Sequence, residues 1–124
     1  CRVVAGTRRR EHITPVLKNL HWLPVEQRIE YKVALITYKT LRNKQPEYLA
    51  ELVTEHEPPR LLRSSSQHLV ARTYNSRSKL GERSISAASQ KVWNNLPPDL
   101  REVQSESVFK KKLKSCLFAR SYCM

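Results

Sequence analysis

Carboxylates are the first residues to examine for chemistry, and this sequence holds few that stand together. Eleven of its 124 residues are acidic, and a single one of these, Asp99, is an aspartate. Nucleotidyl transfer by two metal ions needs carboxylates clustered around a pair of hard cations, and the sequence has no Asp-Asp pair. The glutamates are spread along helical patterns, which is typical of solvated helix faces. The sequence therefore predicts no catalytic residues and no enzymatic activity in this chain.

Histidines and cysteines offer no stronger basis for a catalytic or metal site. His21 has no serine, cysteine or acidic partner at a recognisable spacing, so we expect it to be a structural histidine. The four histidines and the three cysteines Cys1, Cys116 and Cys123 lack the paired spacing of zinc ligands. Reduced cysteines fit a cytoplasmic and nuclear protein. We therefore expect no metal, no cofactor and an intracellular location.

Positive charge is the strongest feature of the composition. The net charge is +12, and residues 58–124 contribute +9 of it, with thirteen lysines and arginines against four acids. An excess of this size favours polyanions, of which nucleic acid is the usual one. The alternative is that the charge is incidental on a protein-interaction module. The two differ in one respect: basic side chains of the C-terminal half that converge on one face of the folded chain would favour nucleic acid, and evenly spaced ones would favour the interaction module.

The pattern of apolar residues predicts a mainly α fold, a small multi-helix domain of four to six helices. The length fits one domain, and no apolar run approaches the roughly 18 residues that a membrane-spanning helix needs. We expect a basic N-terminal segment at residues 1–11 and a single helical domain at residues 12–124. Within that domain, residues 12–57 and 84–124 form two helical halves, and residues 58–83 form a basic extended segment. Residues 60–79 lack a helical period and are expected to be an extended linker or a short β-hairpin.

Two helices are expected to supply most of the core. The longest spans residues 24–41, should be the most buried, and has a predicted core face of Val25, Ile29, Val33, Ile36 and Leu41. The last begins near Ser105 or Ser107, with an inward face of Val108, Phe109, Leu113, Cys116 and Leu117. A third helix after Pro46 carries an acidic ridge of Glu47, Glu51 and Glu55. The two tryptophans, Trp22 and Trp93, lie beside proline turns with apolar neighbours, so both are expected to pack in the core.

Three blocks of the sequence resemble a known family when taken in order and at their spacing. They are HITPVLKNLHWLPVEQRIEYKVALITYKTL at residues 12–41, Trp93-Asn94-Asn95-Leu96-Pro97, and FKKKLK at residues 109–114. Together they resemble the C-terminal tail of a LINE-type (non-LTR) retrotransposon reverse transcriptase, over roughly residues 8–118. The chain departs from that pattern before Pro46, where the loop Asn43-Lys44-Gln45 has no glycine, and at Ser89-Gln90, where a proline is missing.

The resemblance implies a segment that follows the polymerase domain and helps to grip template RNA or target DNA. Such contacts go to phosphates, which gives affinity and salt dependence but little sequence readout. The candidate residues are Arg8, Arg9, Arg10, Arg72, Arg77, Lys79, Arg83, Lys110, Lys111, Lys112 and Lys114. Two alternatives stay open, namely a scaffolding module that packs on the upstream polymerase domain and a decayed fragment without function.

Overall fold

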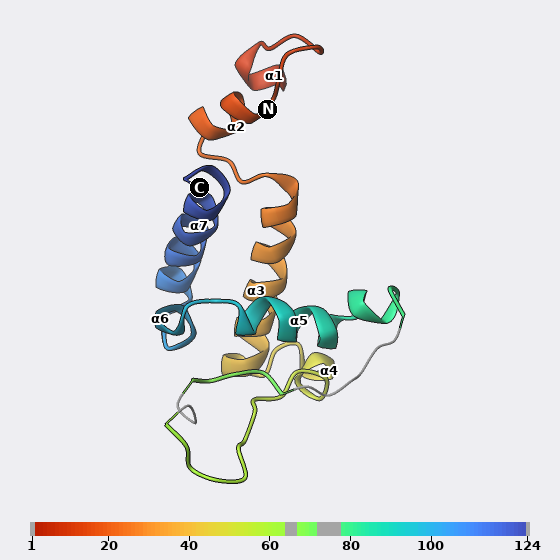
Figure 1. The fold of residues 1–124 in the computed structure, drawn as a ribbon, viewed down its shortest axis with the longest axis vertical. Helices are drawn as coiled ribbons and strands as arrows, with labels where there is room; N and C mark the ends of the chain where they lie inside the picture. The colour runs from red at the N-terminus through yellow and green to blue at the C-terminus, as the bar shows by residue number, and fades with distance from the viewer. Residues whose placement is uncertain (1, 64–66, 72–77, 124) are drawn as a thin grey trace.

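The protein is mainly helical, as the sequence predicts (Figure 1). The computed structural model describes residues 2–63, 67–71 and 78–123. In these residues the α-helices are α1 (Arg2–Ala5), α2 (Thr14–Asn19), α3 (Val25–Asn43), α4 (Glu47–Ala50), α5 (Ile85–Asn94), α6 (Pro98–Arg101) and α7 (Glu106–Tyr122), with a short 3-10 helix, η1 (Gly81–Arg83). Three of the α-helices, α1, α4 and α6, are single turns of four residues.

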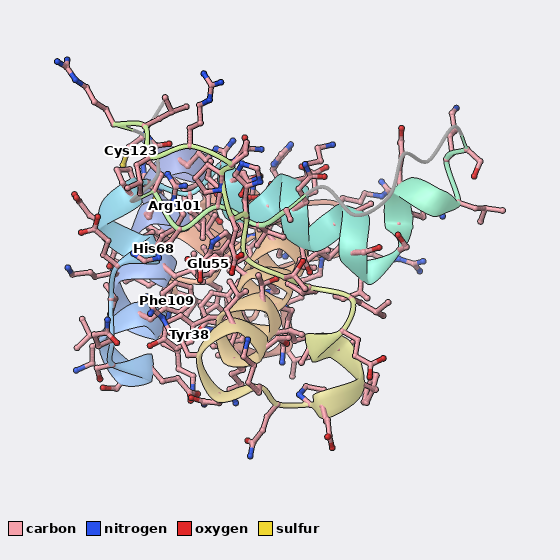
Figure 2. The ribbon with its side chains drawn as sticks, turned by 90° about the horizontal axis from the view of Figure 1, so that it is seen from below. Tyr38, Glu55, His68, Arg101, Phe109 and Cys123 are labelled. Atoms are coloured by element: carbon pink, nitrogen blue, oxygen red, sulfur yellow. The ribbon has the colours of Figure 1, made fainter. Side chains whose placement is uncertain are left out.

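Helix α3 is the central element, and α5 and α7 both pack against it (Figure 1). The three helices meet at three buried aromatic rings, Tyr38 of α3, Trp93 of α5 and Phe109 of α7. Tyr38 and Phe109 lie side by side (Figure 2), and their rings stack with centroids 4.3 Å apart. The centroid of the Trp93 ring lies 5.9 Å from that of Phe109. The Tyr38 hydroxyl also donates to the backbone carbonyl of Gln104 at 2.6 Å. The two helical halves of the sequence therefore share one core, and the prediction that Trp93 packs there is confirmed.

The predicted core face of α3 is wrong in its first half. Val25 and Ile29 are 71% and 60% exposed, whereas the buried residues of the helix are Ala34, Thr37, Tyr38 and Thr40. The cause is where the neighbours lie, since α5 crosses only the C-terminal half of α3 (Figure 1). Threonine tolerates this buried position because its hydroxyl bonds within the helix: Thr37 donates to the carbonyl of Val33 at 2.8 Å.

The end of α3 shows the position at which the loop before Pro46 would favour a glycine. Lys44 caps the helix with φ 54° and ψ 32°. This left-handed conformation usually favours glycine, because a side chain there crowds the backbone.

The third predicted helix is only the single turn α4, so Glu55 does not continue the acidic ridge of Glu47 and Glu51. It instead lies 2.5 Å from Nδ1 of His68.

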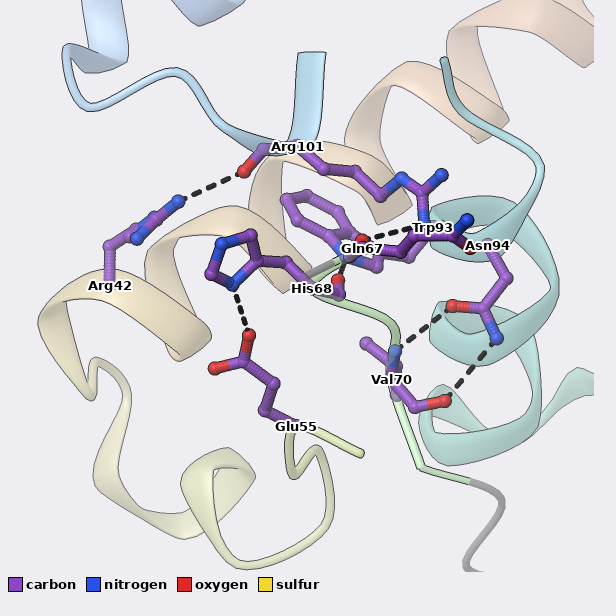
Figure 3. A network of polar contacts seen from close by, with 8 residues as sticks. All are labelled: Arg42, Glu55, Gln67, His68, Val70, Trp93, Asn94 and Arg101. Atoms are coloured by element: carbon purple, nitrogen blue, oxygen red, sulfur yellow. Dashed lines mark hydrogen bonds and ion pairs between the residues drawn. The ribbon is translucent and has the colours of Figure 1, made fainter. Parts of the chain in front are cut away.

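Residues 67–71 of the extended basic segment are tied to the helices by polar contacts (Figure 3). They pair with residues 54–56 rather than with each other, through hydrogen bonds from His56 N to Leu69 O and from Ala71 N to Thr54 O. Val70 exchanges two hydrogen bonds with the side-chain amide of Asn94, at 2.9 and 3.3 Å. Trp93 Nε1 also donates to the carbonyl of His68 at 2.8 Å, so the Trp93-Asn94 pair of the sequence motif holds this segment against α5.

Two arginines, buried Arg101 and half-buried Arg42, add hydrogen bonds to the same network (Figure 3). Arg101 is buried, and its Nη1 donates to the carbonyl of Gln67 at 2.8 Å. Its own carbonyl accepts a hydrogen bond from Nη2 of Arg42 at 2.9 Å. Burial lowers the pKa of the Arg101 guanidinium. The guanidinium groups of both residues thus form hydrogen bonds within the protein.

Candidate nucleic-acid interface

Helix α7 presents most of the lysines that the sequence nominates. Phe109, Leu113 and Leu117 are buried against the core, so Lys111, Lys112 and Lys114 are exposed on the rest of the helix surface. One residue of the predicted inward face departs from it. Val108 is 41% exposed, because one position along a helix is a rotation of about 100° away from buried Phe109. Cys116 is half-buried and packs against the core, as predicted.

Lys110 differs from the other three lysines because it has an acidic partner. Its Nζ lies 2.6 Å from the Glu106 carboxylate, one turn earlier on the same helix. Lys39 of α3 approaches the same carboxylate at 3.3 Å. The hydrogen bond between Glu106 and Lys110 lowers the pKa of Glu106 and raises that of Lys110. Much of the charge of Lys110 is therefore compensated within the protein.

The remaining cationic candidates do not join α7 on one face. Arg8, Arg9 and Arg10 are exposed in the connection between α1 and α2. Lys79 and Arg83 are exposed at η1, and η1 lies at the opposite end of the molecule from α7 in both views (Figures 1 and 2). Arg72 and Arg77 lie outside the described residues. Among the described residues, the nominated cations therefore do not converge on one face, and α7 alone groups several of them.

A cleft beside α7 offers a more specific arrangement. Its volume is about 490 Å³, and it is lined by His21, Trp22, Leu23, Arg28, Tyr31 and Lys114. A second hollow of about 330 Å³ shares His21 and Lys114 and continues along α7 past Phe118. The cleft lies between the α2–α3 connection and α7. Figure 1 shows these two segments side by side near the C-terminus.

Trp22 is another residue whose position differs from the sequence prediction. It is 37% exposed, so its expected place in the core is wrong. The chain turns at His21, which has a φ of 52°, and the buried place beside the core is taken by the next residue, Leu23. The guanidinium of Arg28 lies over the indole ring, 5.8 Å from its centroid, a distance typical of a cation–π contact.

The backbone around Trp22 is held from several directions. The Trp22 N–H donates to the carbonyl of Leu17 at 2.9 Å, and the Trp22 carbonyl accepts a hydrogen bond from the Tyr122 hydroxyl at 3.0 Å. Burial raises the pKa of that hydroxyl, so it remains a donor at neutral pH. Arg28 is fixed in turn, because its Nε donates to the carbonyl of Leu23 at 2.9 Å. The indole is therefore presented on a fixed backbone.

The position of His21 adds to this arrangement. Its ring stacks on Phe118 of α7, with centroids 5.2 Å apart and an angle of 29° between the planes. The contact fits the expectation of a structural histidine, because it joins the α2–α3 connection to α7. Among the residues that the structure describes, no group of three histidines, cysteines or acids lies close enough to hold a metal ion.

The sequence nominated one residue of this cleft, Lys114, and missed Arg28 and Tyr31. These two are three positions apart and therefore share a side of α3. That spacing was the signal in the sequence that could have indicated a cation beside an aromatic ring. Aromatic rings beside cations form a surface suited to planar, negatively charged groups. In the described part of the chain no helix is long and apolar enough to cross a membrane. Comparison with protein families, with curated proteins and with solved structures gives no match for this chain.

Proposed function

We propose that this chain is a non-catalytic accessory domain of a LINE-type reverse transcriptase and binds template RNA or target DNA through phosphate contacts. The observation that carries the proposal is the group of exposed lysines Lys111, Lys112 and Lys114 on α7, opposite a face committed to the core. The resemblance of the three sequence blocks and the net charge of +12 support it. Its partners are then RNA or DNA and the upstream polymerase domain, in the cytoplasm and the nucleus.

The experiment is a salt titration of binding to RNA and to duplex DNA. Replacing Lys111, Lys112 and Lys114 together with glutamine removes three cations that can pair with phosphates. The slope of log K against log salt should fall by about 2 to 3, at roughly 0.7 to 0.9 for each phosphate left without its lysine. Glu47→Gln with Glu51→Gln is the matched control on α4 and should not weaken binding, since acidic residues repel phosphate. Equal binding by the lysine variant and the parent at every salt concentration would exclude α7 as the binding surface.

A second candidate function is favoured by one other observation. Val25 and Ile29 are exposed on the N-terminal half of α3, and apolar residues that share a helix face suit packing against another protein. In this alternative the domain packs on the polymerase domain as a scaffold. Val25→Ser with Ile29→Ser should then weaken the association of the two domains and leave nucleic-acid binding unchanged. An unchanged association would exclude this surface.

A further inference from the structure

The cleft beside α7 combines an exposed aromatic ring with cations. Its lining includes Trp22, Tyr31, Arg28 and Lys114, and among the residues that the structure describes no aspartate or glutamate lines it. Its volume of about 490 Å³ falls within the range of about 300–1,000 Å³ that is usual for small-ligand sites. A ligand that fits this lining has a flat ring and a negative charge, and a nucleotide has both.

The aromatic part of the cleft is arranged for stacking rather than for core packing. Trp22 keeps 37% of its surface exposed, although its backbone is fixed by hydrogen bonds to Leu17 and from Tyr122. An exposed ring on a fixed backbone costs little further ordering when a ligand binds it. Every nucleic-acid base has a face that can stack on such a ring, whatever its identity.

The charged part of the cleft comes from both walls. Arg28 is held on the α3 side by its hydrogen bond to the Leu23 carbonyl, and Lys114 lines the cleft from α7. Lys111 is exposed one turn before Lys114 on α7, which extends the positive surface away from the cleft. A strand whose base enters the cleft therefore meets cations where its phosphates must pass.

We propose that this cleft binds one unpaired base of single-stranded RNA or DNA, with the base against Trp22 and the adjacent phosphate at Lys114. A base in a duplex is stacked between its neighbours and cannot reach the indole without being unpaired, so the cleft selects single strands. The inference rests on the proposed function and deepens it, since phosphate contacts alone do not distinguish single strands from duplexes.

The test compares a single-stranded RNA oligonucleotide, a DNA oligonucleotide of the same sequence, and the corresponding DNA duplex. Binding of each to the whole chain is measured for the parent and for Trp22→Ala, Trp22→Phe, Lys114→Gln and Tyr48→Ala. Tyr48 is the matched control, because it is an exposed aromatic residue on α4, outside the cleft. Circular-dichroism melts verify that each variant is folded.

Trp22→Ala should weaken binding of both single strands about 5- to 100-fold, the loss of one stacked base, and leave the duplex unchanged. The slope of the salt dependence should stay the same, because every cation that pairs with a phosphate is still present. Trp22→Phe should retain most of the affinity, and Lys114→Gln should lower the slope by roughly 0.7 to 0.9. Tyr48→Ala should behave as the parent.

The outcomes separate this inference from the proposed function. If the parent binds single strands and Trp22→Ala binds them equally well, the cleft is not a base site and the proposed function stands. If Trp22→Ala loses single-strand and duplex binding to the same extent, the indole has only a structural role and the inference is again overturned. If the parent binds none of the three oligonucleotides, the proposed function fails, and the inference fails with it.

Discussion

Replacing Phe109 with alanine should remove a large share of the stability of the fold. Phe109 is fully buried where α3, α5 and α7 meet, stacked on Tyr38 at 4.3 Å and beside Trp93 at 5.9 Å. A buried phenylalanine replaced by alanine costs about 3–5 kcal/mol, and most when the neighbours cannot move into the cavity. Tyr38 is held by its hydrogen bond to the Gln104 carbonyl, so we expect the upper part of that range. A chain of this length has a total stability of about 6–18 kcal/mol.

Urea denaturation followed by circular dichroism measures the effect. The upper part of that range is about 4–5 kcal/mol, so with a slope of about 2 kcal/mol per molar urea the midpoint for Phe109→Ala should fall by about 2–2.5 M. The neighbouring residue on the same helix is the control: Val108→Ala should change the free energy of unfolding by no more than about 0.5 kcal/mol, as is usual for surface positions. Equal losses in the two variants would mean that α7 faces the core with a different side and would refute the reasoning.

Four further results are expected. Ile29→Asp should leave the thermal melt almost unchanged, whereas Ala34→Asp should unfold the protein by burying an unpaired charge. Equal melting temperatures of the two variants would mean that the two residues do not differ in burial. Lys44→Gly should stabilise the fold by about 0.5–1 kcal/mol, because it relieves the left-handed conformation at the end of α3, and a lower melting temperature would contradict this. The pKa of Glu106 is held below its ordinary 4.5 by its lysine partners, so its contribution to stability is present above that pH and is lost as the pH falls through the lower folded value. Glu106→Gln should therefore lose less stability on acidification at low salt. Identical acid profiles of the variant and the parent would exclude these ion pairs as a source of stability. The chain should not incorporate nucleotides in the presence of Mg²⁺, and incorporation that is lost on Asp99→Asn would overturn this expectation.

Local patterns were sufficient to predict the helical character of the fold. The period of apolar residues predicted α3 and α7, and the proline turns marked the connections before α3 and before α6. The core places of Phe109, Leu113 and Leu117 followed from their spacing along one helix face. These features depend on interactions between residues close in sequence, which is why a single sequence reveals them.

The errors arose where a distant element decides which side of a helix is covered. Val25 and Ile29 have the spacing of a core face, yet α5 does not reach that half of α3. Trp22 and Leu23 are adjacent apolar residues, and the turn at His21 determines which of them is buried. The pairing of residues 67–71 with residues 54–56 depends on side chains of α5 and α6. None of these could be predicted from periodicity.

The cleft was even less accessible to sequence reasoning. Lys114 was nominated because of its charge. Arg28 and Tyr31 line the cleft only because α7 lies beside the start of α3. The hydrogen bond that ties the two segments joins residues 100 positions apart. A basic residue count also overstated the charge available to a ligand, since Arg42, Arg101 and Lys110 have partners within the protein.

The long separation between Trp22 and Tyr122 has a consequence for the order of events during synthesis. A ribosome adds about 5–20 residues per second, so the 100 positions between them correspond to roughly 5–20 s of translation. Throughout that interval the tryptophan has been synthesised but lacks the helix that completes its surroundings. Neither the aromatic core nor the cleft can close before α7 emerges, because α7 supplies Phe109 to the first and Lys114 to the second. The nascent domain therefore completes both in a late step, after most of its lysines and arginines have been synthesised.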